Sequence, residues 1–137
     1  MKHPVNIFLV IVLAYFTLTS SNCNKTQNPI TGGGKGGNAI LTVIPEAHGT
    51  FLDSCKVYIK YGILDAPANG VYDDSIANVT MLDTIPTATF RNLKVGLYHI
   101  YGVGYHTGYA QPNVEGGVPY TISVEDSQSA YLPTYSY

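Results

Sequence analysis

The side chains that could act as acids, bases or metal ligands are scattered along this 137-residue chain. General acid–base catalysis needs two such groups within hydrogen-bond reach, and a zinc site needs three or four ligands at characteristic spacings. Neither pattern is present, so the sequence predicts a protein that is not an enzyme and that holds no metal and no cofactor. The groups considered are His48, His99, His106, Asp53, Asp65, Asp73, Asp74, Asp83 and Glu115.

Asp73, Asp74 and Ser75 form a run of oxygen-bearing side chains that could contribute to a calcium site. Calcium loops, however, place acidic residues at alternating positions and end in a glutamate, and both features are missing here. Because Asp and Ser are common turn formers, we expect these residues to lie in a solvated turn.

The N-terminus has the layout of an export signal that ends at a cysteine. Lys2 and His3 precede an apolar run from Ile7 to Phe16, and Thr19-Ser20-Ser21-Asn22 leads into Cys23. A membrane-spanning helix needs about 20 apolar residues, so this run is too short to span but suits a secretory signal peptide. We therefore expect residues 1–22 to be removed.

The residues before Cys23 resemble the lipobox of bacterial lipoproteins, in which the cysteine becomes the first residue of the mature chain and is acylated. That family usually has Leu three residues before the cysteine and Gly or Ala directly before it, whereas Ser20 and Asn22 stand here. The resemblance implies a lipid on Cys23 and a place in the bacterial cell envelope, as an outer-membrane lipoprotein facing either the periplasm or the surface. Ordinary cleavage after Ser21 is the alternative and would give a secreted protein.

The second cysteine is expected to be structural. If Cys23 carries lipid, Cys55 is the one cysteine left in the mature chain and no intramolecular disulfide can form; after simple cleavage the two could pair. Cys55 alternates with Val57, Ile59 and Tyr61, which predicts a strand residue that faces the core.

Composition excludes some partners. The chain has 7 Lys and Arg against 9 Asp and Glu, spread singly, so no basic surface for nucleic acid is expected. Residues 23–38 are polar and glycine-rich, which predicts a flexible tether. A phosphate-binding loop would require a preceding strand and a following helix, and neither is indicated.

Residues 39–137 show an alternation with period two, typical of half-buried strands, and almost no helical period. Clusters of Gly, Pro, Asn and Asp separate the candidate strands. About seven strands over one domain predict an all-β, antiparallel, Greek-key sandwich, a class that includes the immunoglobulin-like fold. The expected strands are 39–44, 55–61, 79–82, 87–92, 97–104, 120–124 and 129–132.

The segment 88–102 carries a more specific pattern. Phe90, Leu93, Gly96 and Tyr98 stand where transthyretin-like modules of the carboxypeptidase regulatory-like and collagen-adhesin B-type families place an aromatic, a leucine, a turn glycine and a tyrosine. We expect Phe90, Leu93, Tyr98 and Ile100 to share one core and Gly96 to adopt a positive φ. The resemblance implies a fold and no activity. Predicted strand 39–44 has no lysine and 129–132 no asparagine, so an internal isopeptide bond is not expected.

Tyrosines are the most prominent candidate binding residues, since the chain has 12 of them. Tyr101, Tyr105, His106 and Tyr109 are predicted to belong to a long aromatic loop at one end of the sandwich. Tyrosine offers rigid, amphipathic contact area, so such a loop could bind a sugar or a protein. The alternative is that these tyrosines cover a small core. His99, which alternates with Tyr98 and Ile100, is expected to be an exposed strand residue.

Two short motifs indicate modification. Asp74-Ser75-Ile76 and Asp83-Thr84-Ile85 resemble the sequon that some Gram-negative lineages use for O-glycosylation, which makes Ser75 and Thr84 candidate acceptors. Asn78-Val79-Thr80 has the N-glycosylation form, which needs a eukaryotic-type secretory route.

These patterns together predict a lipid-anchored cell-envelope protein that acts as a non-catalytic binding or assembly module. The expected partners are the membrane, through Cys23, and envelope proteins or glycans. A secreted carbohydrate-binding or adhesin-like module is the alternative.

Overall fold

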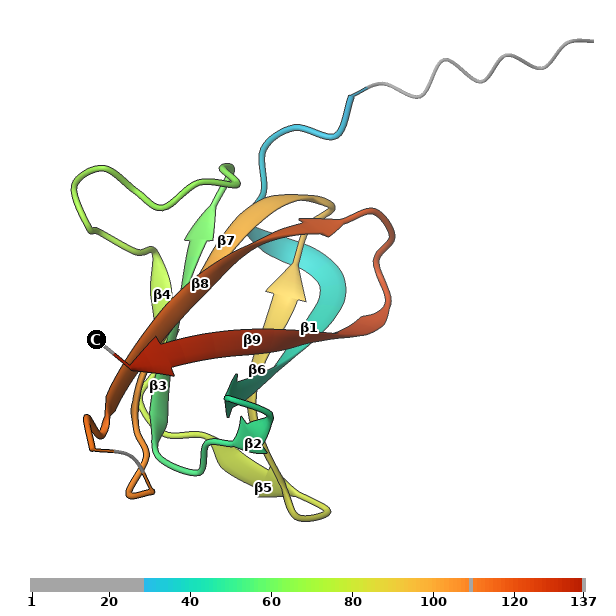
Figure 1. Cartoon of the computed structure of the whole chain (residues 1–137). Helices are drawn as coiled ribbons and strands as arrows, with labels where there is room; N and C mark the ends of the chain where they lie inside the picture. The colour runs from blue at the N-terminus through green and yellow to red at the C-terminus, as the bar shows by residue number, and fades with distance from the viewer. Residues whose placement is uncertain (1–28, 109, 137) are drawn as a thin grey trace, which may run out of the picture.

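The computed structural model describes residues 29–108 and 110–136, so the predicted signal peptide, Cys23 and Tyr109 lie outside the described residues. The described part consists of strands, turns and loops, and it contains no helix able to cross a membrane (Figure 1). Its strands are β1 (Lys35–Ala47), β2 (Thr50–Phe51), β3 (Cys55–Tyr61), β4 (Asp74–Ile76), β5 (Thr80–Leu82), β6 (Ile85–Leu93), β7 (Gly96–Tyr105), β8 (Asn113–Ile122) and β9 (Ser127–Ser136).

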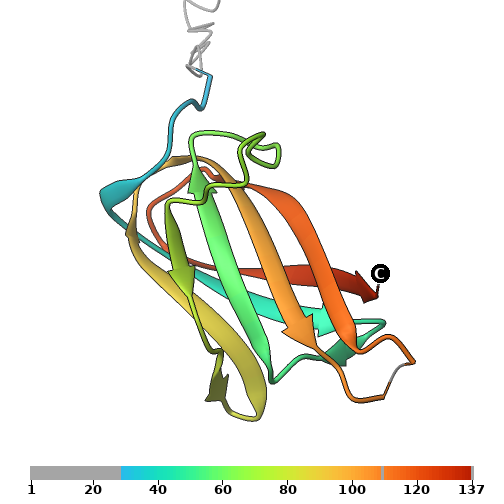
Figure 2. The ribbon, with the colours of Figure 1, turned by 90° about the vertical axis from the view of Figure 1, so that its left-hand side faces the viewer.

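The strands form one curled sheet that folds over on itself into two layers. The order is β4-β3-β7-β8-β9-β1-β6-β5, with β2 paired to β1. Strands β3, β7 and β8 form one layer, and β1, β9 and β6 cross behind it (Figure 2). The corner between the layers is narrow, because β8 and β9 pair only at Val114 with Ser136 and at Glu115 with Tyr135. The predicted all-β sandwich is confirmed.

The strand count and one pairing differ from the prediction. Strands β2 and β4 are two and three residues long, too short for an alternation to reveal. Most of β8 was not predicted, because Gly116, Gly117 and Pro119 interrupt the alternation of apolar and polar residues. The expected strand 120–124 consists of the end of β8 and two residues of the following loop. The first and last strands, β1 and β9, pair in parallel across eight residue pairs. A parallel pair needs a long crossover, which the rest of the domain provides.

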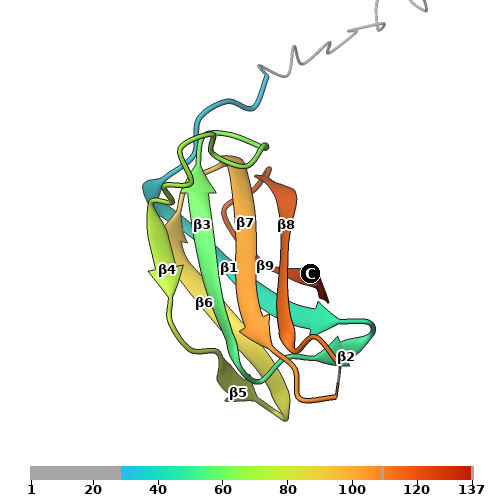
Figure 3. The ribbon, with the colours of Figure 1, turned by 60° about the vertical axis from the view of Figure 1, so that its left-hand side comes forward.

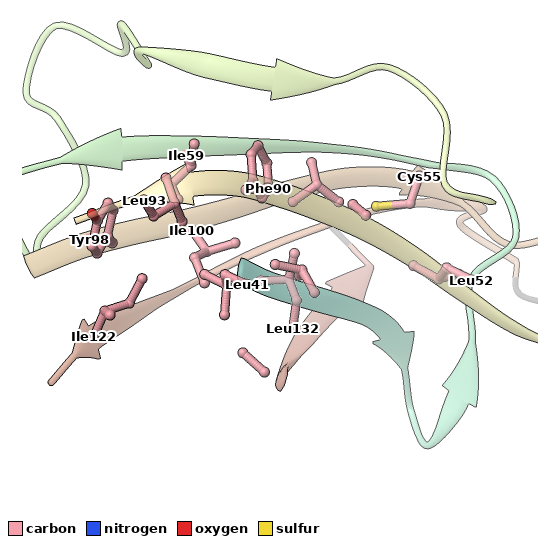
Figure 4. Packing of buried hydrophobic residues seen from close by; sticks show 14 of the residues in the cluster. Leu41, Leu52, Cys55, Ile59, Phe90, Leu93, Tyr98, Ile100, Ile122 and Leu132 are labelled. Carbon is pink, nitrogen blue, oxygen red and sulfur yellow. The ribbon is translucent and has the colours of Figure 1, made fainter. Parts of the chain in front are cut away.

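The core lies between the two layers (Figure 4). Phe90, Leu93, Tyr98 and Ile100 are all at most 2% exposed and belong to one cluster, as expected from the transthyretin-like pattern of segment 88–102. Cys55 is buried in the same cluster, so its predicted packing role is also confirmed. Desolvation raises the pKa of its thiol to about 11, which keeps it protonated and unreactive at neutral pH.

Gly96 is needed for a reason other than the one expected. The residue with a positive φ in this turn is Asn92, at 59°. Gly96 instead lets two backbones meet, since a Cβ there would lie 2.5 Å from the Cα atom of Gly33. The requirement for glycine was predicted correctly, but its cause is close approach between segments that are distant in the sequence.

The glycine-rich segment joins the domain earlier than the predicted boundary at residue 39. Leu97 donates a backbone hydrogen bond to Gly32 and Lys94 donates one to Gly34. The hydroxyl of Tyr98 accepts a bond from the Gly34 N–H (3.0 Å) and donates to the Lys94 carbonyl (2.7 Å). Residues 32–38 therefore pack on the sandwich, and β1 begins at Lys35.

Tyr98→Phe is expected to lower the free energy of unfolding by about 1–3 kcal/mol, because it leaves the buried Gly34 N–H without its acceptor. Denaturant unfolding measures the change. Tyr131→Phe is the matched control, since Tyr131 is 60% exposed, and should stay within about 0.5 kcal/mol of the wild type. Equal stability of the two variants would contradict the role given to the Tyr98 hydroxyl.

Candidate ligand-binding face

The residues of the predicted aromatic loop separate in the structure. Tyr101 and Tyr105 both lie within strand β7, and the loop proper begins at His106. Tyr101 points to the outer face of the β3-β7-β8 layer, whereas Tyr105 and His106 line a cavity at one end of the sandwich. Tyr109 lies outside the described residues.

A cluster of rings covers the outer face of β3 and β7. We call Tyr58, Tyr72, His99 and Tyr101 the aromatic face. Tyr58 and Tyr101 are paired across the two strands, with ring centroids 6.1 Å apart. Tyr72 comes from the β3–β4 connection and lies 5.6 Å from the Tyr101 ring, nearly parallel to it, and 5.5 Å from the Tyr58 ring. The loop thus completes a cluster that the sheet begins.

His99 belongs to this cluster and is not the exposed residue that was expected. It is 7% exposed, because the Tyr72 ring lies 6.1 Å away and its hydroxyl is 3.4 Å from Nδ1. Gly117 on β8 leaves room on the other side, since a Cβ there would come within 2.7 Å of the imidazole. Desolvation is the main cause that lowers the pKa of His99, although the negative charge of Asp65 opposes it. The imidazole is therefore neutral at pH 7.

A hollow of about 340 Å³ borders the aromatic face. Tyr58 and Tyr72 supply its apolar wall, and Asp73, Asp74 and Ser75 supply polar groups. This volume is at the lower end of the range of about 300–1,000 Å³ for small-molecule pockets. The hollow thus combines ring surfaces with hydrogen-bonding groups on the scale of a small ligand.

Both carboxylates of the hollow are held in place by lysines. Asp73 accepts hydrogen bonds from Lys60 Nζ (2.9 Å) and from the backbone N–H of Tyr61 (2.7 Å). Asp74 forms an ion pair with Lys35 at 2.9 Å, which links β4 to the start of β1. Desolvation acts to raise the pKa of each aspartate, but these hydrogen bonds and charges outweigh it and hold both pKa values below their usual range. The two aspartates are ionised at neutral pH, and their charge is balanced.

The turn expected at 73–75 is in part an edge strand: Asp73 precedes the strand, and Asp73 and Ser75 are exposed as expected. Asp74 and Ser75 belong to β4, which pairs with β3. Tyr61 also contributes, since its hydroxyl lies 3.4 Å from Asp74. The pKa of Tyr61 is raised well above its usual value, mainly by desolvation and then by the charge of Asp74. The Tyr61 hydroxyl therefore stays neutral and can donate a hydrogen bond.

Two charged residues stand at the rim of the aromatic face. Lys56 lies over the Tyr58 ring, with Nζ 4.8 Å from the ring centroid. The Tyr101 hydroxyl donates a hydrogen bond to Glu115 on β8. These contacts leave Tyr58 and Tyr101 half-buried and restrict their rotamers, so a ligand would lose little side-chain entropy there.

The second cavity, of about 410 Å³, lies between the β5–β6 hairpin and the β7–β8 loop. Phe51, Met81 and Tyr105 provide its apolar surface, and Asp53 and His106 its polar surface. It contains a single tyrosine, whereas the aromatic face brings three tyrosines and an imidazole into contact. We therefore take the aromatic face as the candidate site.

The predicted glycosylation residues lie beside the two cavities. Ser75 is exposed on β4 at the edge of the smaller hollow. Thr84 is exposed in the two-residue turn between β5 and β6 and lines the larger one. Asp83 and Thr84 both have a positive φ, 47° and 78°, a conformation that costs energy in a β-branched residue. Asn78 is also exposed, between β4 and β5.

The remaining acid–base candidates form no cluster of three among the described residues, although two of them share a cavity. Within residues 29–108 and 110–136, no three His, Cys, Asp or Glu side chains are placed to share a metal ion. Asp53 and His106 line the larger cavity, Asp65 lies in the β3–β4 connection, and Asp83 in the β5–β6 turn. Sequence reasoning missed Tyr58 and Tyr72 as site residues. The available signal was the outward position of Tyr58 between Lys56 and Lys60, but nothing local places Tyr72 beside it.

Comparison with known proteins gives no relative from which to transfer a function. No family model, no curated protein sequence and no solved structure matches the chain.

The neutral His99 predicts a stability that depends on pH. Its pKa is lower folded than unfolded, so the unfolded chain binds a proton more readily, and stability falls as the pH drops below about 6.5. Urea unfolding at several values between about pH 7.5 and pH 5 measures this slope. His99→Gln should flatten it and His106→Gln should retain it. An unchanged slope in His99→Gln would exclude a buried neutral imidazole.

Proposed function

We propose that this protein is a lipid-anchored component of the bacterial cell envelope that acts by binding, without catalysis, and that its aromatic face takes a neutral saccharide. The observation that carries the proposal is the contact among three tyrosine rings beside a hollow whose two carboxylates are already paired with lysines. The anchor is Cys23, on the strength of its lipobox-like context.

The chemistry of the aromatic face suits a sugar ring. The C–H groups of a pyranose pack against aromatic rings, and its hydroxyls donate to carboxylates and exchange hydrogen bonds with serine. Tyr72 and Tyr58 offer the rings, and Asp73, Asp74 and Ser75 offer the polar partners in the same hollow. Sites of this composition, apolar walls with a few placed polar groups, are typical of small-molecule recognition.

The charge balance favours a neutral ligand over a cation. An aromatic cage with free carboxylates would suit a quaternary ammonium group. Here Lys60 lies 2.9 Å from Asp73 and Lys35 lies 2.9 Å from Asp74, so each negative charge is compensated within the site. At the rim, the positive charge of Lys56 is matched by the negative charge of Glu115, so the rim does not change this balance. A cation would therefore meet no net attraction, whereas a hydroxyl can still donate to the remaining lone pairs of the carboxylates.

Tyr72→Ala tests the site, because this ring comes from a loop and its removal leaves the core intact. Truncation of a central tyrosine in an interface costs about 2 kcal/mol, so saccharide affinity should fall at least about 10-fold. Screening on a glycan array, followed by calorimetric titration of the best neutral glycan, measures the change. Tyr131→Ala, on the far layer and 60% exposed, should bind as the wild type does. Equal loss in both variants, or capture of charged glycans alone, would contradict the proposal.

Cys23→Ala tests the anchor. In the bacterial host this variant should move from the membrane fraction to the soluble fraction, and the wild-type mature chain should begin at Cys23 with added acyl mass. Cys55→Ala is the control and should remain in the membrane, because that thiol is buried and its pKa is raised to about 11. An unmodified, soluble wild-type chain that begins at Asn22 would instead support the secreted carbohydrate-binding module.

A further inference from the structure

We infer that the end of the sandwich at which the chain enters is a membrane-contact surface, whose exposed apolar residues insert into the interfacial region of the bilayer. This inference rests on the proposed anchor at Cys23. We call this surface the proximal end, and it consists of Ile30, Ile63, Leu64, Val71 and Val95.

Backbone hydrogen bonds bring these residues together from separate parts of the chain. Leu97 is the meeting point, since its N–H donates to Gly32 and its carbonyl accepts from Gly62. Ile30 lies two residues before the first of these contacts, and Ile63 follows the last. Figure 3 shows the β3–β4 connection and the β6–β7 turn at the end of the sandwich where residues 29–34 enter. The proximal end is thus one surface built from three segments.

The apolar character of the proximal end is concentrated in the β3–β4 connection. Val71 is 56% exposed, and Ile63 and Leu64 are 37% and 38% exposed. Single exposed apolar residues are ordinary on a protein surface, but several on adjoining loops mark an interaction site. Asp65 is the one charged residue between Gly62 and Tyr72, so the β3–β4 connection, which is the most apolar segment of this surface, carries little charge. Lys94 stands beside Val95 in the β6–β7 turn, with Glu125 close to the same turn.

The length of the N-terminal segment favours the bilayer as the partner of the proximal end. Five residues separate Cys23 from Pro29, and a fully extended chain spans at most about 3.6 Å per residue, so Pro29 stays within about 22 Å of a lipid on Cys23. Strand β7 alone has ten residues and runs about 33 Å. The opposite end of the sandwich, formed by β2 and the β5–β6 hairpin, therefore cannot reach the bilayer while the proximal end points away.

Because the lipid on Cys23 would already hold the protein at the membrane, even a weak insertion of the loops is enough to orient the domain. A short tether keeps the loops at a high effective concentration near the lipid, so insertion no longer has to overcome the entropy of bringing protein and membrane together. The strength of interfacial binding scales with the apolar area that enters the interface. The aromatic face lies on the flank of the sandwich, along β3 and β7, so this orientation leaves it open to a ligand.

The absence of tryptophan from the chain permits a clean test. The full-length lipoprotein is expressed with a single reporter, Ile63→Trp or Val71→Trp, and reconstituted into phosphatidylethanolamine and phosphatidylglycerol vesicles with brominated acyl chains. Leu82→Trp is the control, because Leu82 is equally apolar and 59% exposed but lies on β5 at the opposite end.

The expected result is quenching by brominated lipid that is several-fold stronger for Ile63→Trp and Val71→Trp than for Leu82→Trp, with a blue-shifted emission. Because both positions are exposed, these variants should fold, and two reporters guard against a local failure. The inference is overturned if the protein co-sediments with the vesicles but tryptophan at 63 and at 71 is quenched no more than in the control. The anchor would then stand, and this result is expected if the proximal end binds a protein partner instead. Failure to co-sediment would instead overturn the anchor.

Discussion

The hydroxyl of Tyr98 is the constraint on which the rest of the structure depends. Its ring is fully buried at one end of the core, so the hydroxyl must find its partners within the protein. It finds them in Gly34, from the segment that enters the domain, and in Lys94, from the β6–β7 turn. Together with the backbone bonds of Leu97 to Gly32 and of Lys94 to Gly34, this group holds the entering chain at one end of the sandwich, which is the end closest to the proposed anchor on Cys23.

The candidate site follows from the same strand. Along β7 the side chains alternate, so the register that directs Tyr98 and Ile100 into the core directs His99 and Tyr101 outward. The pairing of β7 with β3 adds Tyr58 beside Tyr101. The β3–β4 connection then returns across this face and brings Tyr72 onto the cluster. The same connection carries Ile63 and Leu64 to the proximal end, so a single loop serves both proposed surfaces.

The fold was largely predictable because strand alternation and buried side chains are local signals. Cys55 was placed in the core by the alternation of its strand, and Phe90, Leu93 and Ile100 by the transthyretin-like pattern of segment 88–102. Each expected strand overlaps an observed one, although 120–124 covers only the end of β8. The errors arose where burial depends on distant neighbours. His99 looked exposed from its own strand and is covered by Tyr72, which is 27 positions away.

The set of side chains that forms the aromatic face could be predicted only in part from the sequence. Of the predicted loop residues, Tyr101 lies in the aromatic face, whereas Tyr105 and His106 line a separate cavity. Tyr101 and Tyr105 lie on the same face of β7, so the strand itself does not separate them. The β3–β4 connection covers Tyr101 with Tyr72, whereas the β5–β6 hairpin forms a cavity with Tyr105. The ion pairs of Asp73 and Asp74 were hidden as well, since Lys35 is far away in sequence.

By itself, the sequence determined the β class, the inward and outward faces of β3 and β7 and the lipobox-like context of Cys23, because each is encoded within a few neighbouring residues. The glycine at position 96 was also expected, but its cause is the approach of Gly33, which only the tertiary structure decides. The tertiary structure decided which rings meet, which charges are neutralised and which loops surround the entering chain. Those properties depend on segments brought together by strand pairing and by the buried hydroxyl of Tyr98. No local pattern specifies such contacts, since their energy exists only once the sandwich has closed.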